Sequence, residues 1–387
     1  MVRVRKEKIK FDNEFLFVYY ILSFHILKPL RFMLNNFYTM LLLVNTVIVL
    51  YFLWKNNNCI LRKTIIYIIF INLILIFNLI SYFFEKNIYF LDYIYNFILY
   101  GIIPIILFSY VKNFEKILYY FSFFSVILFL IYSIEPFYNY FISGTYMTFG
   151  FGGIMYSYIG LVLYRKVFHI KKYFVFEILS IILIFIFGNK GASMVVILFT
   201  IMLEILICIK DKKKKKIILM IFCSTTIIIN IKSIIVSINN FILTKGMYSY
   251  ALTTLINTFE GKKTSMDSRM ILWNNAFSMI KHKPLIGNGL GYYETFEGIY
   301  THNIFLDILV SYGIIGLTLF IILIIKSLIN IMKSKNYYKK IFGIIIFNLS
   351  IPLLSFSSNI YYNWSFWILL IIGIGWGTIK DINYKLK

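Results

Sequence analysis

Charged residues are scarce in this chain. They occupy 14% of its 387 positions, whereas a soluble domain typically carries about a quarter. The mean hydropathy is +0.81, and long apolar runs recur along the whole chain instead of being confined to a cleavable leader at its start. The composition therefore excludes an ordinary soluble protein and indicates a protein that crosses a membrane several times.

Cysteines and closely spaced carboxylates are also scarce. The three cysteines, Cys59, Cys208 and Cys223, are far apart, so neither a disulfide framework nor a cysteine metal site is indicated. Among the carboxylates expected on the external side, no two have the Asp-x-Asp type of spacing that would hold a divalent metal beside a phosphate. We therefore expect metal-independent chemistry, with no metal ion and no cofactor.

Continuous apolar sequence is what the chain has in abundance. Only helices and closed barrels can pair all their backbone groups in lipid, and the runs are not alternating as barrel strands would be. A crossing needs about 20 apolar residues. The runs predict one all-α polytopic membrane domain over residues 1–387 with about twelve transmembrane helices. The expected spans are Phe15–Ile26, Phe37–Trp54, Thr64–Phe84, Phe90–Val111, Ile117–Ile134, Tyr146–Tyr164, Phe174–Gly188, Ala192–Ile209, Ile217–Ser237, Asn303–Ile325, Ile341–Ser355 and Ile360–Ile379.

Basic residues are unevenly divided between the two sides that these spans define. With the N-terminus inside, 28 of the 39 Lys and Arg residues fall in cytoplasmic segments and 10 in external ones. The positive-inside rule then predicts that both termini are cytoplasmic. Under this rule the run Lys212–Lys216 is a cytoplasmic turn between spans, and the net charge of +23 requires no nucleic-acid partner.

One external loop, residues 238–302, is far longer and more polar than the others. Asp267 or Ser268 is expected to cap a helix, in which apolar residues from Met270 to Ile280 recur at helical spacing. Lys283-Pro284 ends this helix, and the glycines that follow predict a flexible turn. The helix either covers a cavity or simply rests on the outer leaflet.

Three side chains on the external side are candidates for chemistry. His302, where the loop enters the membrane, can exchange a proton near neutral pH, although a lone interfacial histidine is more often a satisfied polar residue. Lys190 and Arg269 are cations on the side that has few of them. Each either snorkels at the membrane boundary or binds an anionic lipid phosphate.

Several short motifs, taken in order, resemble the characteristic region of the O-antigen polymerase and O-antigen ligase superfamily. They are Asn189–Ala192, then Ser268–Trp273 as an Arg-x-x-x-Trp helix, Lys283–Gly289 as a Pro-Leu-x-Gly-x-Gly turn, the Thr301–Asn303 His-Asn pair, and Tyr312–Gly316 as a Gly-x-x-Gly span. The resemblance covers roughly residues 180–320. Lys190 stands where the family usually has Arg, and Ser311 stands where many members have an acidic residue.

The resemblance implies a membrane glycosyltransferase of GT-C-like architecture with one large external loop, in the bacterial cytoplasmic membrane. Its donor would be an undecaprenyl-pyrophosphate-linked oligosaccharide on the outer face, and polyprenyl pyrophosphate would leave as an acceptor hydroxyl takes the sugar. Implied partners besides membrane lipid are a chain-length regulator and a repeat-unit flippase. The implied catalytic residues are His302, as base or phosphate contact, with Arg269 and Lys190 on pyrophosphate; the implied substrate-binding residues are Asn303, Lys283, Gly287 and Gly289.

Polymerases and ligases share these motifs. A polymerase builds O-antigen, capsule or exopolysaccharide, whereas a ligase transfers the finished glycan to lipid A-core; we favour a polymerase because polymerases are diverse in sequence. A flippase for lipid-linked sugars would also have about twelve spans, but transporters often show internal repeats, and this chain has one large asymmetric loop. A purely structural protein would leave the external cations unexplained.

Overall fold

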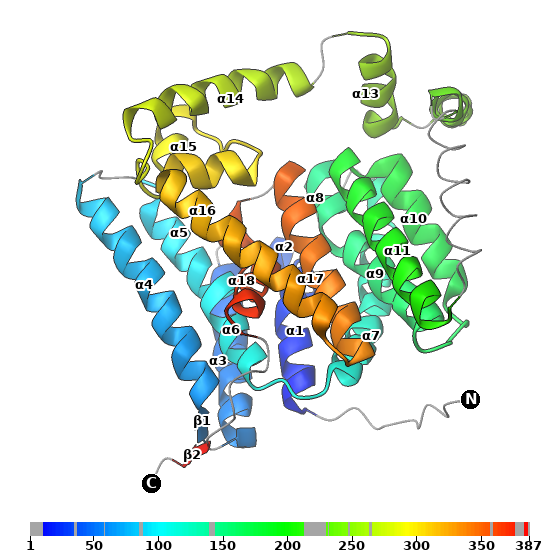
Figure 1. The fold of residues 1–387 in the computed structure, drawn as a ribbon. Helices are drawn as coiled ribbons and strands as arrows, with labels where there is room; N and C mark the ends of the chain where they lie inside the picture. Colours follow the sequence, from blue (N-terminus) through cyan, green and yellow to red (C-terminus); the bar gives the residue numbers. More distant parts are fainter. Residues whose placement is uncertain are drawn as a thin grey trace.

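The chain folds into a bundle of helices with further helices across one end (Figure 1). The computed structural model describes residues 11–34, 37–57, 59–84, 88–138, 144–212, 230, 232–246, 248–262, 265–356, 359–375 and 383–385.

The first half of the chain contributes the elements up to residue 166. They are α1 (Asn13–Ile26), α2 (Leu30–Leu34), α3 (Tyr38–Asn57), β1 (Cys59–Leu61), α4 (Arg62–Phe84), α5 (Phe90–Phe97), the π-helical turn η2 (Ile98–Ile102), α6 (Ile103–Ser109), α7 (Phe114–Tyr132), η3 (Glu135–Tyr138), α8 (Tyr146–Phe151) and α9 (Gly153–Lys166).

The second half contributes α10 (Phe174–Phe187), α11 (Lys190–Lys210), a helix over Lys232–Thr244, α13 (Tyr250–Phe259), α14 (Ser265–His282), α15 (Tyr292–Glu297), α16 (Ile304–Lys333), α17 (Tyr337–Phe356), η4 (Ile360–Tyr362), α18 (Trp364–Gly375) and β2 (Asn383–Lys385). The two strands pair antiparallel, with Cys59 opposite Lys385.

Seven of the described helices are long and apolar enough to cross a membrane. Three further apolar helices, Phe174–Phe187, Lys232–Thr244 and Trp364–Gly375, are shorter. The expected multi-pass, all-helical membrane protein is therefore confirmed. The count of about twelve spans stays a prediction, and residues 217–229 of the expected ninth span lie outside the described residues.

Short polar side chains begin several of these helices. Asp12 accepts a hydrogen bond from the Phe15 backbone N–H (3.0 Å), and Asn113 accepts one from the Lys116 N–H (3.2 Å). These are N-cap contacts, which pair backbone donors that have no partner within the helix. They fix where α1 and α7 start.

Several expected spans are interrupted helices. The span expected at Tyr146–Tyr164 is two helices, α8 and α9, which meet at Gly152. The span expected at Phe90–Val111 contains the π turn η2, and α16 is kinked at Gly313, whose φ of 63° and ψ of −166° are not helical.

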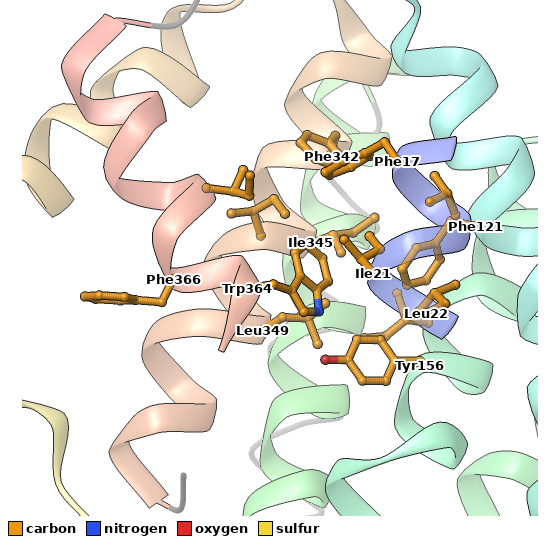
Figure 2. Packing of buried hydrophobic residues seen from close by; sticks show 14 of the residues in the cluster. Phe17, Ile21, Leu22, Phe121, Tyr156, Phe342, Ile345, Leu349, Trp364 and Phe366 are labelled. Carbon is orange, nitrogen blue, oxygen red and sulfur yellow. The ribbon is translucent and has the colours of Figure 1, made fainter. Parts of the chain in front are cut away.

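The hydrophobic core lies between α1, α7, α9, α17 and α18. Phe17 and Ile21 of α1 lie close to Phe342 and Ile345 of α17 and to Trp364 of α18 (Figure 2). Phe17 packs edge-on against Phe342, with ring centroids 6.1 Å apart. Because α1 is buried on most sides, this short helix is a central element of the bundle.

The polar segment between the late spans is mostly helical. The helix Lys232–Thr244 runs past Ser237, so the expected loop start at residue 238 falls inside a helix. Helices α13, α14 and α15 lie across the upper end of the bundle in Figure 1. Helix α14 begins at Ser265, two to three residues before the expected cap, and ends at His282, as Lys283-Pro284 predicts.

Candidate functional site

Lys190 is positioned by the turn between α10 and α11. Asn189 begins α11 by accepting a hydrogen bond from the Ala192 N–H (2.7 Å), and its amide donates to the Met147 carbonyl of α8 (3.0 Å). The turn is thereby held against α8. The half-buried Lys190 ammonium donates to the Thr258 hydroxyl of α13 (3.3 Å).

Arg269 is positioned by α14 and the tryptophan one turn further along. Residues four apart lie on the same face of a helix. The Trp273 indole N–H donates to the Thr301 carbonyl (3.0 Å), which ties this face of α14 to the segment that precedes α16. The Arg-x-x-x-Trp motif therefore places Arg269 close to His302.

His302 is held in an unusual conformation by its neighbours. Its φ of 55° lies in the left-handed region, which costs a residue other than glycine of the order of 1–3 kcal/mol. On one side Thr301 is fully buried and donates twice to the Asp307 carboxylate, from its N–H (3.1 Å) and its hydroxyl (2.5 Å). On the other side the Asn303 carboxamide oxygen caps α16 by accepting from the Phe305 N–H (3.0 Å).

Arg269 lies within electrostatic range of both Lys190 and His302. Burial lowers the pKa of the Arg269 guanidinium, which still stays charged at neutral pH. Among the side chains that the structure describes, no carboxylate forms an ion pair with any of the three. Charges that are partly buried are normally paired, so the two cations Lys190 and Arg269 are suited to an anionic ligand; together with the neighbouring His302 they are called the cation group.

Burial, with a smaller contribution from the positive charge of Arg269, lowers the pKa of His302 to about 4. The imidazole is therefore neutral at pH 7. Its Nδ1 is buried and has no hydrogen-bond partner within the described part of the chain, and its ring lies 4.3 Å from that of Tyr300. A neutral imidazole carries one nitrogen with a free lone pair, which can accept a proton from a ligand.

The glycine-rich turn after α14 is interlocked with the kink in α16. The Asn288 and Gly289 N–H groups donate to the Val310 and Ser311 carbonyls (2.8 and 3.0 Å). A Cβ on Gly287 would lie 2.5 Å from the Ser311 carbonyl, and one on Gly313 would lie 2.6 Å from the Gly287 nitrogen. The expected flexible turn is therefore a tightly hydrogen-bonded one that fixes α14 to α16.

Of the remaining expected substrate contacts, Asn303 directly follows His302, whereas Lys283, Gly287 and Gly289 lie beyond the far end of α14. Lys283 follows the last residue of α14, and fourteen steps along the helix separate it from Arg269 by roughly 21 Å. Gly287 and Gly289 contact α16 through their backbones, and Asn303 caps that helix. What these four residues do toward a substrate stays a prediction.

Two buried carboxylates lie near the site and were not singled out from the sequence. Glu294 accepts hydrogen bonds from the Tyr93 hydroxyl (2.6 Å) and the Asn359 amide (3.2 Å), and burial raises its pKa. The Asp307 carboxylate accepts the two hydrogen bonds from Thr301 described above. Their positions, just before and just after the Thr301–Asn303 motif, were the only signal in the sequence. Within the described residues, no group of three or more His, Cys, Asp or Glu side chains could hold a metal ion.

An apolar cavity of about 450 Å³ lies alongside α16, starting below the site. Ile286 of the turn, Ile308 and Tyr312 of α16, Phe70 of α4 and Trp367 of α18 line its walls. The cavity therefore extends from the level of the site toward the middle of the bundle.

Fold and site together define a multi-pass membrane protein with a cationic site at one end of its helices. Residues 176–321 match the model of a family described as Wzy_C, O-antigen ligase, and these residues include the whole cation group. The chain thus carries a domain of the O-antigen ligase and polymerase family, whose enzymes transfer glycans from lipid-linked donors, and the resemblance is confirmed. No match was found among curated proteins or solved structures.

Proposed function

We propose that the chain is a membrane glycosyltransferase that polymerises undecaprenyl-pyrophosphate-linked oligosaccharide repeat units into a surface polysaccharide: O-antigen, capsule or exopolysaccharide. The observation that carries the proposal is the cation group, in which Arg269 lies within electrostatic range of Lys190 and His302 and no described carboxylate pairs with them. The site faces the external side of the cytoplasmic membrane.

In the proposed reaction, an acceptor hydroxyl attacks the anomeric carbon of the lipid-linked sugar. A new C–O bond forms, the bond between that carbon and the pyrophosphate oxygen breaks, and polyprenyl pyrophosphate leaves with the electron pair. The hydroxyl proton passes to His302. No metal ion and no cofactor takes part.

Lys190 and Arg269 bind the pyrophosphate. Arg presents a planar fork to two phosphate oxygens, and Lys acts as a point charge. Both side chains are partly buried, and in a poorly solvated site they stabilise the charge that develops on the leaving group.

His302 serves as the base rather than as a cationic phosphate contact, because its pKa of about 4 leaves it neutral at pH 7. A bound pyrophosphate brings negative charge close to the imidazole. That charge raises the pKa of His302, and the histidine becomes a stronger base once the donor is present.

The polyprenyl chain lies in the apolar cavity beside α16. The cavity begins at Ile308, four residues beyond the start of the helix that follows His302, and is lined almost entirely by apolar side chains. A lipid in this cavity would have its pyrophosphate at the level of the cation group.

The test is an in vitro reaction of purified protein with undecaprenyl-pyrophosphate-linked repeat units, resolved as a polymer ladder in the presence of EDTA. Replacing Lys190 or Arg269 by Ala removes a charge-assisted contact and should slow polymer formation about ten- to a hundredfold. His302→Ala removes the base and should lower turnover about a hundred- to ten-thousandfold with little change in donor binding.

The matched control is Lys245→Ala, which removes an exposed cation outside the cation group. It should leave the ladder unchanged. Wild-type rates in the Lys190→Ala, Arg269→Ala double variant, or loss of activity in EDTA, would contradict the proposal.

A ligase is the second candidate, because the matched family model is described as O-antigen ligase. The same assay separates the two. Repeat units alone yield a ladder with a polymerase, whereas a ligase yields product only when lipid A-core is added as acceptor.

A further inference from the structure

A second cavity, of about 360 Å³, lies among α1, α3, η2, α8 and α18. Lys28 and Arg31, which follow the end of α1, line it. The start of α1 is at the opposite end of the bundle, where the Glu14 carboxylate accepts from the Lys112 and Asn113 N–H groups. The cavity thus opens at the same end as the cation group.

The charged side chains that line this cavity, Lys28 and Arg31, are both cationic. Lys28 lies within electrostatic range of Arg31 and of one carboxylate, the buried Glu135. Burial lowers the pKa of Lys28, and Glu135 opposes that shift. A second carboxylate, Asp92, accepts a hydrogen bond from the lining residue Tyr362, but neither carboxylate lines the cavity itself.

Aromatic rings form much of the cavity wall. The rings of Tyr156 and Trp364 lie 6.5 Å apart and are inclined by 29° (Figure 2). Trp364 is 4% exposed, and its indole interacts with the Tyr156 hydroxyl. Flat apolar rings with polar edges suit the C–H faces and hydroxyls of a sugar.

Tyr100 reaches the same cavity from the π turn η2. Single π turns within α-helices are uncommon and occur often at functional sites. The Tyr20 hydroxyl donates to the Leu99 carbonyl within this turn (3.0 Å), which helps to stabilise it. The turn therefore holds Tyr100 where a regular helix would place a different residue.

The short helix α8 contacts both the cavity and the cation group. Thr148 and Phe151 of α8 line the cavity. The same helix accepts the Asn189 amide hydrogen bond at the Met147 carbonyl, and its Tyr146 lies within electrostatic range of Arg269. A ligand in the cavity would lie one helix width from the donor.

We propose that this cavity is the acceptor site and binds an anionic oligosaccharide, with Lys28 and Arg31 on its acidic group and the Tyr156 and Trp364 rings on its sugar faces. The acceptor role rests on the proposed function, because glycan transfer needs an acceptor next to the donor.

The test measures binding of two fluorescent tetrasaccharides, acidic tetragalacturonate and neutral maltotetraose, to the full chain in lipid nanodiscs. The wild type should prefer tetragalacturonate. Lys28→Gln and Arg31→Gln should each weaken tetragalacturonate binding about tenfold, because each removes a charge-assisted contact, while maltotetraose binding stays the same. Arg31 is exposed, so Arg31→Gln keeps the test valid if Lys28→Gln does not fold.

The matched controls are Lys245→Gln, an exposed cation elsewhere, and Arg269→Gln, which lies in the donor site. Both should bind tetragalacturonate as the wild type does. The proposal is overturned if the wild type shows no preference for the acidic sugar, if Lys28→Gln and Arg31→Gln bind normally, or if Arg269→Gln or competing inorganic pyrophosphate abolishes binding.

A kinetic measurement separates this inference from the proposed function. Arg31→Gln should raise the KM for the acceptor and leave kcat and the donor KM unchanged. Charge-dependent tetragalacturonate binding without any polymer ladder would reject the polymerase and keep the acidic-sugar site. A normal ladder with an unchanged acceptor KM in Arg31→Gln would keep the polymerase and reject the acidic-sugar site.

Discussion

The reactivity of His302 depends on contacts made by its neighbours. Its left-handed backbone is enforced by Thr301, which binds Asp307, and by Asn303, which caps α16. The sequence predicted that His302 lies where the external loop enters a span and singled out Arg269 as one of the few external cations, and the family resemblance assigned both to one site. The lowered pKa could not be predicted, because it arises from burial that only the packing of α14 over this segment produces.

The charge of Arg269 should control the titration of His302. With only four histidines in the chain, the ring signals of ¹⁵N-histidine-labelled protein can be assigned by His302→Gln. We expect a pKa of about 4 in the free protein. Arg269→Gln removes a nearby positive charge and should raise that pKa toward the ordinary value of about 6.5.

Inorganic pyrophosphate should also raise the His302 pKa, because it adds negative charge beside the imidazole. Lys245→Gln is the control and should change nothing. An unaltered His302 titration in Arg269→Gln, or in the presence of pyrophosphate, would show that the two side chains are not in electrostatic contact.

At the scale of helices, hydropathy predicted where most elements lie but not where they break. An average over about 18 residues does not register one residue in a different conformation. The Gly313 kink and the π turn at Ile98–Ile102 were therefore missed, although Gly313 lay in the Gly-x-x-Gly motif. The glycine turn was expected to be flexible from its local sequence. Its hydrogen-bond partners, the Val310 and Ser311 carbonyls, are on another element, so the local sequence did not reveal them.

The interlock between Gly287 and Gly313 predicts a large effect of a single methyl group. Gly313 has a φ and ψ that glycine alone adopts readily, and an added Cβ would meet the Gly287 nitrogen at 2.6 Å. Gly313→Ala should therefore lower the thermal midpoint of the purified protein and reduce polymer formation.

Gly261→Ala is the matched control. Gly261 also has a positive φ of 68°, but nothing lies within 4 Å of an added Cβ, so the substitution carries only the backbone cost of roughly 1–2 kcal/mol. The difference between the two variants measures the interlock. Equal midpoints for the two would mean that the turn and the kink do not depend on each other.

For the molecule as a whole, the asymmetry of basic residues is the basis of the orientation. The helical membrane class followed from composition alone, whereas the side of the membrane depends on the 28-to-10 division of Lys and Arg. Lys262, beyond α13, and Lys335, between α16 and α17, are expected on opposite sides.

Thiol labelling of intact cells checks this orientation. In a variant without Cys59, Cys208 and Cys223, Lys262→Cys should react with a membrane-impermeant reagent and Lys335→Cys should not. After the cells are opened, both should react, which controls for accessibility. Labelling of residue 335 alone in intact cells would place the cation group on the cytoplasmic side.

The position of α8 beside both the second cavity and the cation group has a consequence for how such a protein can diversify. Every residue that lines the second cavity belongs to residues 21–156 or 353–364, whereas the family match, with the whole cation group, covers residues 176–321. On the proposed assignments, separate stretches of the gene encode the residues that bind the pyrophosphate and accept the proton and the residues that recognise a particular sugar. A lineage that changes its surface sugars could then acquire the new preference by substitution or recombination in the outer stretches, while the inherited transfer chemistry in the middle stays untouched.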